Sequence, residues 1–310
     1  MATEKLLLPG GVRKEIFTLF RNYYQLTKPK VVALLVLTAW VGMMLATPEP
    51  PAISQLSLAC LGIALVSAAA AAFNQILDQK IDAQMARTYM RPLPKGKLST
   101  AQAVYFAVAL AISGFVLLGV LINWLTAWLT LLGLFGYAVI YTLLLKRATP
   151  QNIVIGGIAG ALPPVLGWSA VTGQVSGEAL LLMMIVFTWT PPHFWALAIH
   201  RVNDYARAGI PMLPVTHGIQ FTKTLILLYT LLLALVCLLP YLVGISGLIY
   251  LLGAVFLNAK FIVHAWQLKF RADAESAMKM FRFSIVHLMV LFLVLLVDHY
   301  VYWDIQRLAQ

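Results

Sequence analysis

Long apolar stretches alternate with short polar segments along the whole chain. Most of these stretches exceed the roughly 18 residues at which an apolar helix can cross a bilayer, and the charged residues gather between them. The apolar runs fall at roughly 31–47, 53–77, 101–122, 126–145, 152–170, 177–199, 222–243, 245–266 and 283–303. The pattern predicts an all-α, polytopic membrane bundle of about nine transmembrane helices, within one domain that covers residues 1–310.

The composition supports a membrane protein. Hydrophobic residues make up 61% of the 310 positions and charged residues only 11%, a balance that soluble domains of this size do not reach. Residues 1–28 carry charges before any apolar run begins, so no cleavable signal peptide is expected there. Glu4 and Glu15 argue against an acid-poor transit segment. We therefore expect residues 1–28 to form a cytoplasmic tail.

The basic residues indicate the orientation of the chain. If nine spans are counted, every Lys and Arg except Arg307 falls on one side of the membrane. The positive-inside rule makes that side cytoplasmic, so we expect the N-terminus inside and the C-terminus outside a bacterial inner membrane. The net charge of +11 then reflects topology and attraction to anionic membrane lipid. Nucleic acid is not an expected partner, because the charges are spread over several loops without a recognition motif.

A polar motif closes the second apolar run. Asn74, Asp78 and Asp82 are spaced four residues apart, which places three oxygen-bearing side chains on one helix face at the membrane edge. Acids at such positions are costly and usually functional, and paired carboxylates suit Mg²⁺ and a diphosphate. Arg87 and Arg91 follow closely as candidate ligands of phosphate oxygens. The alternative is a solvated helix end whose arginines serve only topology.

A second polar motif closes the sixth apolar run, on the same side of the membrane. His200 and Asp204 have the same four-residue spacing, and His193 lies about two turns earlier, directly after two prolines that would open a pocket. The acids of the two motifs can face each other across a central cavity, each holding a metal ion bridged to one diphosphate. Because Mg²⁺ prefers oxygen, we expect His200 to contact phosphate or to orient Asp204.

Both motifs resemble the UbiA superfamily of intramembrane prenyltransferases. The segments that carry the resemblance are Asn74-x-x-x-Asp78-x-x-x-Asp82, Arg87-Thr-x-x-Arg91-Pro-Leu-Pro94, Tyr141-Thr-x-x-Leu-Lys146-Arg147-x-Thr149-Pro150-Gln-Asn152, Gly156-Gly157-x-x-Gly160, Thr190-Pro-Pro-His-Phe-Trp-Ala-Leu-Ala and Asp204-Tyr-x-x-Ala-Gly-Ile-Pro-Met-Leu-Pro214. The last two are similar to the branch of the superfamily that acts on haem. This chain has His200 where members with aromatic acceptors usually carry an Asp, which leaves Asp204 as the only acid of the second motif.

The resemblance implies a fold and a reaction. The implied fold is a UbiA-like helical bundle with a central cavity that opens near the cytoplasmic face. The implied reaction transfers a farnesyl group from farnesyl diphosphate to a vinyl group of haem B and adds water, giving haem O and diphosphate. Mg²⁺ is the implied cofactor, whereas haem B is a substrate. Association with other membrane enzymes of haem biosynthesis is a further expectation.

The resemblance also implies roles for particular residues. The expected metal ligands are Asn74, Asp78, Asp82 and Asp204; the other catalytic and phosphate-binding residues are Arg87, Arg91, Lys146, Arg147 and His200; His193 and Asn152 are candidate contacts of haem and substrate. Structural alternatives stay open for several of these. Lys146 and Arg147 could serve topology alone, and His193 could make a packing hydrogen bond rather than bind haem iron. Asn152 and the glycines that follow it could belong to close helix packing.

Other functions fit parts of the pattern. Within the superfamily, the main alternative is a prenyltransferase for an aromatic acid or a quinone precursor, which would use the same metal site. A transporter would also carry acids at broken helices, although more often near the middle of the membrane. A haem-binding protein without chemistry would keep His193 but would not need Asn74, Asp78 and Asp82 together.

Overall fold

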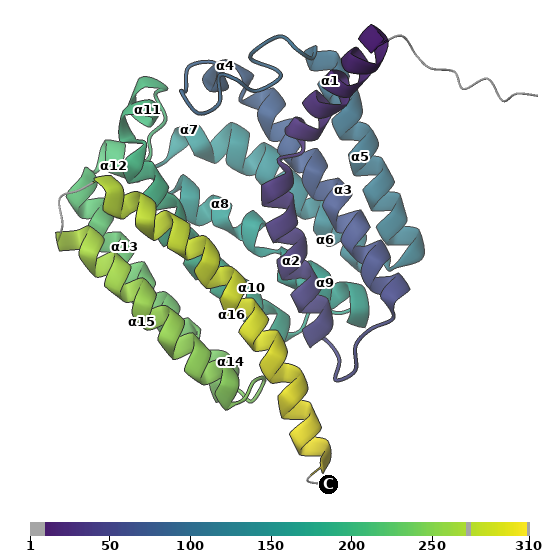
Figure 1. Cartoon of the computed structure of the whole chain (residues 1–310), viewed down its shortest axis with the longest axis vertical. Coiled ribbons are helices and arrows are strands. Elements are labelled where there is room, and N and C mark those ends of the chain that lie inside the picture. The colour runs from purple at the N-terminus through teal and green to yellow at the C-terminus, as the bar shows by residue number, and fades with distance from the viewer. Residues whose placement is uncertain (1–9, 271–273, 309–310) are drawn as a thin grey trace, which may run out of the picture.

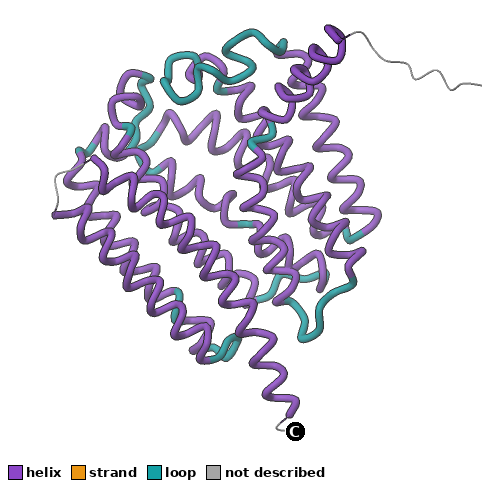
Figure 2. Tube along the Cα trace, viewed as in Figure 1, coloured by secondary structure: helices purple, strands orange, loops and turns teal. Residues whose placement is uncertain are grey.

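The computed structural model describes residues 10–270 and 274–308, and every regular element within these ranges is a helix (Figure 1 and Figure 2). In chain order the helices are α1 (Gly10–Leu26), α2 (Pro29–Leu45), α3 (Ile53–Leu77), α4 (Gln79–Asp82), α5 (Thr100–Leu121), α6 (Trp124–Phe135), η1 (Gly136–Leu145), α7 (Lys146–Ala148), α8 (Asn152–Ala161), α9 (Pro163–Thr172), α10 (Gly177–His200), α11 (Val202–Arg207), α12 (Leu213–Thr216), α13 (Ile219–Val236), α14 (Leu239–Leu242), α15 (Leu248–Phe270) and α16 (Ala274–Leu308). In the described residues, 8 helical segments are long and apolar enough to cross a membrane, or 9 if the bent pair α1 and α2 forms one span. The predicted polytopic bundle of about nine helices is confirmed.

The membrane helices are arranged as a closed ring. α2 packs on α3, α3 packs on α5 and η1, and η1 packs on α8. α10, α13, α15 and α16 then follow in turn, and α16 returns to α2 to close the ring. α1 lies at the top of Figure 1 and α16 ends at the bottom, as an odd number of crossings requires.

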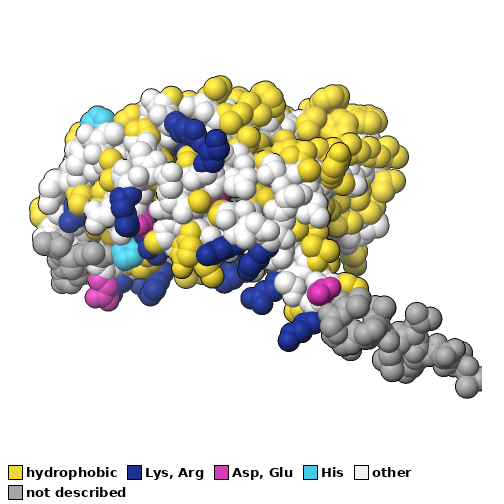
Figure 3. Space-filling model, turned by 90° about the horizontal axis from the view of Figure 1, so that it is seen from above, with side chains coloured by type: hydrophobic (Ala, Val, Ile, Leu, Met, Phe, Trp, Pro, Cys, Tyr) yellow, Lys and Arg dark blue, Asp and Glu magenta, His cyan; other side chains and the backbone are white. Residues whose placement is uncertain are grey.

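Short helices gather at the end of the bundle where α1 lies. α4, α7, α11 and α12 are all found there, next to the ends of membrane helices (Figure 1). Seen from this end, Lys and Arg side chains are spread across the surface (Figure 3). This is the arrangement of basic residues that the sequence predicts for one face of a membrane protein.

Two spans depart from a regular α-helix. The fourth runs from Trp124 to Ala148, but its section Gly136–Leu145 is π-helical. Such turns are rare and frequently mark functional sites. The fifth span, predicted at 152–170, is divided into α8 and α9, and Pro163 and Pro164 begin the second piece. The hydrophobic pattern predicts neither feature, because apolar residues continue through both.

The crossing of α2 and α9 requires glycine in both helices. A Cβ on Gly167 would overlap the carbonyl oxygen of Ala39, and a Cβ on Gly42 would overlap the carbonyl oxygen of Pro164. Backbone atoms cannot rotate away from such an overlap as a flexible side chain can. The two helices therefore approach closely by the small-residue packing that is common between membrane helices.

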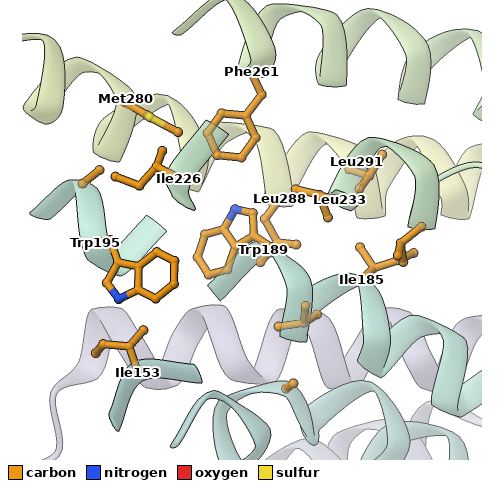
Figure 4. Packing of buried hydrophobic residues seen from close by; sticks show 14 of the residues in the cluster. Ile153, Ile185, Trp189, Trp195, Ile226, Leu233, Phe261, Met280, Leu288 and Leu291 are labelled. Carbon is orange, nitrogen blue, oxygen red and sulfur yellow. The ribbon is translucent and has the colours of Figure 1, made fainter. Parts of the chain in front are cut away.

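The largest buried cluster surrounds α10, α13, α15 and α16. Figure 4 shows Trp189 and Trp195 of α10 within this cluster, together with Ile153 of α8 and Phe261 of α15. Large apolar side chains on the outside of the bundle include Tyr105, Leu252 and Phe256. An apolar exterior around a packed interior is what helices in contact with lipid hydrocarbon require.

The expected cytoplasmic tail contains a helix. Residues 1–9 lie outside the described part of the chain, and residues 10–26 form α1, whose axis is bent by 51° from that of α2. Phe17 and Phe20 are exposed on α1, next to Lys14 and Arg21 in the sequence. Exposed aromatic side chains interspersed with basic residues are typical of a helix that lies on a membrane surface.

Candidate active site

The first polar motif lies where α3 gives way to α4. α3 ends at Leu77, and Asp78 (φ −88°, ψ 1°) separates it from α4. The backbone hydrogen bonds nevertheless keep α-helical spacing, because the Asp78 amide donates to Asn74 O and the Asp82 amide donates to Asp78 O. Asn74, Asp78 and Asp82 therefore follow one another at successive turns, as their spacing predicts, and all three are buried.

Each of the two acids is paired with a cation. Lys146 Nζ donates to Asp78 Oδ2 at 2.5 Å, and Arg91 Nη1 donates to Asp82 Oδ2 at 2.6 Å. Asn74 Nδ2 donates to the same Asp78 oxygen at 2.9 Å. A buried carboxylate that lacked such partners would be strongly destabilising. The contacts also place Lys146 and Arg91, both predicted to bind phosphate, directly beside the two acids.

Lys28 is a site residue that the sequence analysis missed. It lies between α1 and Pro29 and is the one non-glycine residue in the described ranges with a left-handed backbone (φ 48°, ψ 59°). Its ammonium donates to Asn74 Oδ1, and to the Tyr137 hydroxyl at 3.4 Å. Such strained backbone conformations cluster at functional sites. In the sequence, Lys28 counts only as one more basic residue before a span.

The electrostatic surroundings of Lys28 favour an anion. The pKa of its amine is lowered to about 7, mainly by burial and then by the positive charge of Arg91. The carboxylates of Asp82 and Asp78 raise this pKa in part. The ammonium is therefore poorly solvated, and a bound anion would stabilise its charged form.

The π-helical segment η1 lines the motif with polar and aromatic groups. Thr142 Oγ1 accepts a hydrogen bond from Asn74 Nδ2 at 3.0 Å. Tyr137 and Tyr141 stack with their ring centroids 5.6 Å apart. The Tyr141 ring lies so close to Gly156 that a Cβ there would overlap it. This glycine of α8 therefore makes room for an aromatic ring.

The second motif is divided between two helices. α10 ends at His200, Arg201 leaves the helical conformation, and α11 begins at Val202. Asp204 is buried and accepts a hydrogen bond from Arg207 Nη2 at 2.6 Å, while Arg201 Nη1 lies 3.6 Å from its other oxygen. The four-residue spacing of His200 and Asp204 thus does not correspond to one continuous helix.

The two motifs share one electrostatic environment. Burial raises the pKa of Tyr205 in α11, and the positive charge of Arg87 acts against that rise, as does that of Arg91. Both arginines belong to the segment that follows the first motif. Figure 1 shows α4 and α11 at the same end of the bundle, so the segments that follow α3 and α10 both lie at that end.

A cavity of about 850 Å³ lies between α2, α3, η1, α8, α10 and α16. Its charged lining residues are Lys28, Lys30 and Arg87, and most of the remaining wall is apolar. The volume is in the range of roughly 300–1,000 Å³ that is common for small-molecule sites. Cations beside an apolar chamber suit a ligand with an anionic head and an apolar body.

His193 lies on the wall of this cavity. Its ring stacks with Trp189 at a centroid distance of 4.2 Å and with Phe281 at 4.6 Å. Its Nδ1 lies 2.6 Å from the Ser284 hydroxyl on α16. The structure therefore places His193 where a substrate in the cavity could reach it.

Of the residues predicted for the site, Arg87 and His193 are in the cavity lining of the described chain, and the others, Arg147 and Asn152 among them, are not. Arg147 is exposed. Asn152 is buried, and its Nδ2 donates to the Thr149 carbonyl at 2.8 Å and to the Lys146 carbonyl at 3.4 Å. Asn152 thus supports the backbone that carries Lys146. Direct contacts of Arg147 and Asn152 with phosphate or substrate stay predictions.

The donor atoms of the first motif fit Mg²⁺. Asp78 Oδ1 is buried and has no hydrogen-bond partner among the described residues. Mg²⁺ usually binds one or two protein carboxylates and completes its shell with water and phosphate oxygens. Within the described ranges, no three His, Cys, Asp or Glu side chains form a metal-binding group. The roles of Asn74, Asp78, Asp82 and Asp204 as metal ligands stay predictions.

Comparison with protein families identifies the family of this chain. The model of the UbiA prenyltransferase family matches residues 35–296. The chain belongs to the UbiA prenyltransferase family. Both polar motifs and most of the cavity lining lie within the matched residues, and the prediction of a prenyltransferase is confirmed.

Relatives in this family resemble the chain over nearly its whole length. It is 62% identical to a protoheme IX farnesyltransferase of Colwellia psychrerythraea over 285 residues, which cover 92% of this chain and 93% of the relative. It is 61% identical to protoheme IX farnesyltransferase 2 of Shewanella frigidimarina over 299 residues, which cover 96% of this chain and 98% of the relative. The resemblance to the haem branch of the UbiA superfamily is confirmed.

Solved structures share the UbiA fold at low sequence identity. A digeranylgeranylglyceryl phosphate synthase has a TM-score of 0.76 at 20% identity, over 91% of this chain and 99% of its own. A UbiA homolog from Archaeoglobus fulgidus, bound to GPP and Mg²⁺, has a TM-score of 0.59 at 16% identity, over 88% of this chain and 99% of its own. The UbiA-like bundle predicted from the sequence is confirmed.

Proposed function

We propose that this enzyme transfers a farnesyl group from farnesyl diphosphate to a vinyl group of haem B and adds water, giving haem O and diphosphate. The observation that supports this most directly is the buried cluster of Asn74, Asp78 and Asp82, which lies next to a cavity with cationic and apolar walls. The names of the relatives supply the acceptor and the transferred group. A UbiA homolog with bound GPP and Mg²⁺ supports a prenyl diphosphate donor and the metal.

The diphosphate would bind beside the first motif. Asn74, Asp78 and Asp82, with Asp204 across the site, would hold Mg²⁺, which when bound offsets the diphosphate charge and stabilises the leaving group. The cations around the acids would donate charge-assisted hydrogen bonds to the phosphate oxygens. They are Lys28, Arg87, Arg91 and Lys146, with Arg147 and His200 as further candidates.

Cleavage of the bond between C1 of the farnesyl group and the diphosphate oxygen would leave an allylic cation. The apolar wall of the cavity keeps bulk water from this cation. The stacked rings of Tyr137 and Tyr141 line the cavity and can stabilise a positive charge through their faces. The Lys28 ammonium already lies 5.8 Å from the centroid of the Tyr137 ring.

The acceptor would then form the new bond. A vinyl carbon of haem B attacks farnesyl C1, and the positive charge passes to the carbon next to the porphyrin ring. Water adds its oxygen to that carbon and releases one proton. The products are a haem with a hydroxyethylfarnesyl group, diphosphate and the proton. His193 is the candidate haem contact, because it lines the cavity beyond the cationic residues.

We further infer a bacterial inner-membrane enzyme with a cytoplasmic N-terminus and the C-terminus on the other side. The bacterial relatives and the basic surface beside α1 support this orientation. The diphosphate group would then be held near the cytoplasmic face, while the farnesyl chain and haem enter from the lipid. Contacts with other membrane enzymes of haem biosynthesis would suit substrates that partition into lipid.

The acceptor can be tested by direct competition. Full-length protein in lipid vesicles would receive farnesyl diphosphate and Mg²⁺ with haem B, with an aromatic acid such as a hydroxybenzoate, or with both. We expect only the haem to become heavier, by one farnesyl group and one water. Prenylation of the aromatic acid alone would overturn the haem acceptor but keep the metal site. No Mg²⁺-dependent consumption of farnesyl diphosphate would overturn the proposed donor.

A further inference from the structure

His193 lies apart from the residues that would bind the diphosphate. It precedes His200, the last residue of α10, by seven residues, and thus lies about 10 Å further along the helix axis. Among the described histidines it is the one that lines the cavity. Its ring is nearly parallel to Trp189 and Phe281, with interplanar angles of 19° and 27°. These neighbours fix the ring plane, so that polar contacts are made at its edge.

The contacts of Ser284 allow a tautomer of His193 in which Nδ1 carries the proton. The Ser284 hydroxyl donates to the Phe281 carbonyl at 2.7 Å, and its oxygen lies 2.6 Å from His193 Nδ1. A hydroxyl has a single hydrogen to donate, so when Ser284 donates to the Phe281 carbonyl, Nδ1 carries the proton of the second contact and donates it to Ser284. In that arrangement Nε2 keeps its lone pair.

Ser284 is itself firmly held. It is fully buried on α16, and its carbonyl accepts a hydrogen bond from Trp189 Nε1 at 2.8 Å. The same residue thus binds His193 through its hydroxyl and orients one of the rings that stack on it. The donor–acceptor pair of Nδ1 and Ser284 is set by two packed helices rather than by a mobile loop.

Nε2 is the ring nitrogen that a ligand can reach. Within the described residues, Nε2 has no hydrogen-bond partner. The surrounding protein atoms do not enclose it completely. Because His193 borders the cavity and its Nδ1 is engaged by Ser284, Nε2 is the ring nitrogen that remains for a ligand there.

We propose that Nε2 of His193 is an axial ligand of the iron of the haem substrate, and that Ser284 is the positioning residue that holds it in this state. The proposal rests on the proposed function, since it takes haem B as the acceptor. A metal-bound histidine almost always donates its other ring N–H to an oxygen, which fixes the ring and increases its basicity. Coordination of the iron at the porphyrin centre would leave the vinyl groups at the edge to reach the diphosphate site.

A spectroscopic titration tests the ligand without any turnover. Ferric haem B would be added to the purified full-length protein in detergent, without farnesyl diphosphate, and followed by its Soret band and electron paramagnetic resonance. We expect a histidine-ligated spectrum that disappears in His193→Ala and returns when imidazole is added. Ser284→Ala should keep the type of ligand but weaken haem affinity by about 10–100-fold. His264→Ala, on α15 and outside the cavity lining, should match the wild type.

Other outcomes separate this proposal from the proposed function. An unchanged haem spectrum and affinity in His193→Ala would overturn the ligand, even if the wild-type enzyme farnesylates haem B. Unchanged affinity in Ser284→Ala would overturn the positioning role. A wild-type spectrum with lost turnover in His193→Ala would also reject the iron ligand, and would point instead to proton transfer. Absence of haem binding in the wild type, with farnesyl transfer to another acceptor, would remove the proposed function as well.

Discussion

Asp78 is the residue on which the contacts of the site converge. One of its carboxylate oxygens accepts hydrogen bonds from Lys146 and Asn74, while the other is buried without a hydrogen-bond partner in the described chain. A carboxylate held in this way can exchange a protein cation for a metal ion with little movement. Lys146 would then turn to the phosphate oxygens of the bound substrate.

Replacing Asp78 by Asn should abolish most of the activity. The substitution keeps the shape of the side chain but removes the negative charge that would hold Mg²⁺. Because a metal ion supplies several kcal/mol of charge stabilisation, kcat/KM should fall by about a hundredfold or more. The measurement is initial-rate kinetics with farnesyl diphosphate and haem B. Near wild-type activity in Asp78→Asn would contradict the role of this acid.

Replacing Lys28 by Met should weaken binding of the diphosphate. Lys28 reaches Asn74 from the start of α2 and lines the cavity, and a hydrogen bond from a charged donor is worth about 1.5–3 kcal/mol. The KM for farnesyl diphosphate should rise by about tenfold to a hundredfold. Lys80→Met is the matched control, because this substitution removes the same charge from an exposed residue of the nearby helix α4. Equal effects of the two substitutions would show that only net charge matters.

The sequence predicts one half of this site better than the other. The neighbourhood of Asn74, Asp78 and Asp82 follows from four-residue spacing, which is a property of the helix backbone itself. The contact between Lys28 and Asn74 joins residues 46 positions apart and depends on how α2 packs on α3. No local pattern carries that information. Ser284 was missed for the same reason, since a lone Ser in an apolar run has no distinguishing spacing.

At the scale of the elements, the functional groups lie where helices are interrupted. Asp78 divides α3 from α4, η1 carries Tyr137 and Tyr141, and Arg201 divides α10 from α11. Hydrophobic runs predict the spans well because lipid imposes their length and apolar character. They do not predict the π-helical segment η1, because the hydrogen bonding of the backbone changes there while the residues stay apolar. The interruptions at Asp78 and Arg201, in contrast, fall where the predicted apolar runs end.

The close crossing of α2 and α9 gives a test of helix packing. Gly167→Ala should lower the free energy of unfolding by about 1–3 kcal/mol, the usual effect of overpacking, because the new methyl group would overlap the backbone of Ala39. Gly177→Ala is the control, since a Cβ there meets no atom within 4 Å and should change stability by less than about 0.5 kcal/mol. Reversible unfolding in mixed micelles measures both. Equal stability of the two variants would contradict the close crossing.

At the scale of the whole molecule, the orientation in the membrane decides from which side the diphosphate is bound. Single cysteines would be placed at Lys97 and Gln174, which are exposed in loops at opposite ends of the bundle, in a variant whose own Cys60 and Cys237 are replaced by Ser. A maleimide that cannot cross membranes should label Gln174→Cys in cells with a permeable outer membrane, and Lys97→Cys only after lysis. The reverse pattern would place the diphosphate site on the outer face.

In the proposed reaction, one cavity joins a farnesyl cation, a haem vinyl group and a water molecule. The most direct measurement is the mass of the product formed by the full-length enzyme from haem B and farnesyl diphosphate with Mg²⁺ in water labelled with ¹⁸O. We expect a haem that gains one farnesyl group and one water whose oxygen is ¹⁸O. A farnesylated haem without the labelled oxygen, or a haem that gains no farnesyl group, would contradict it.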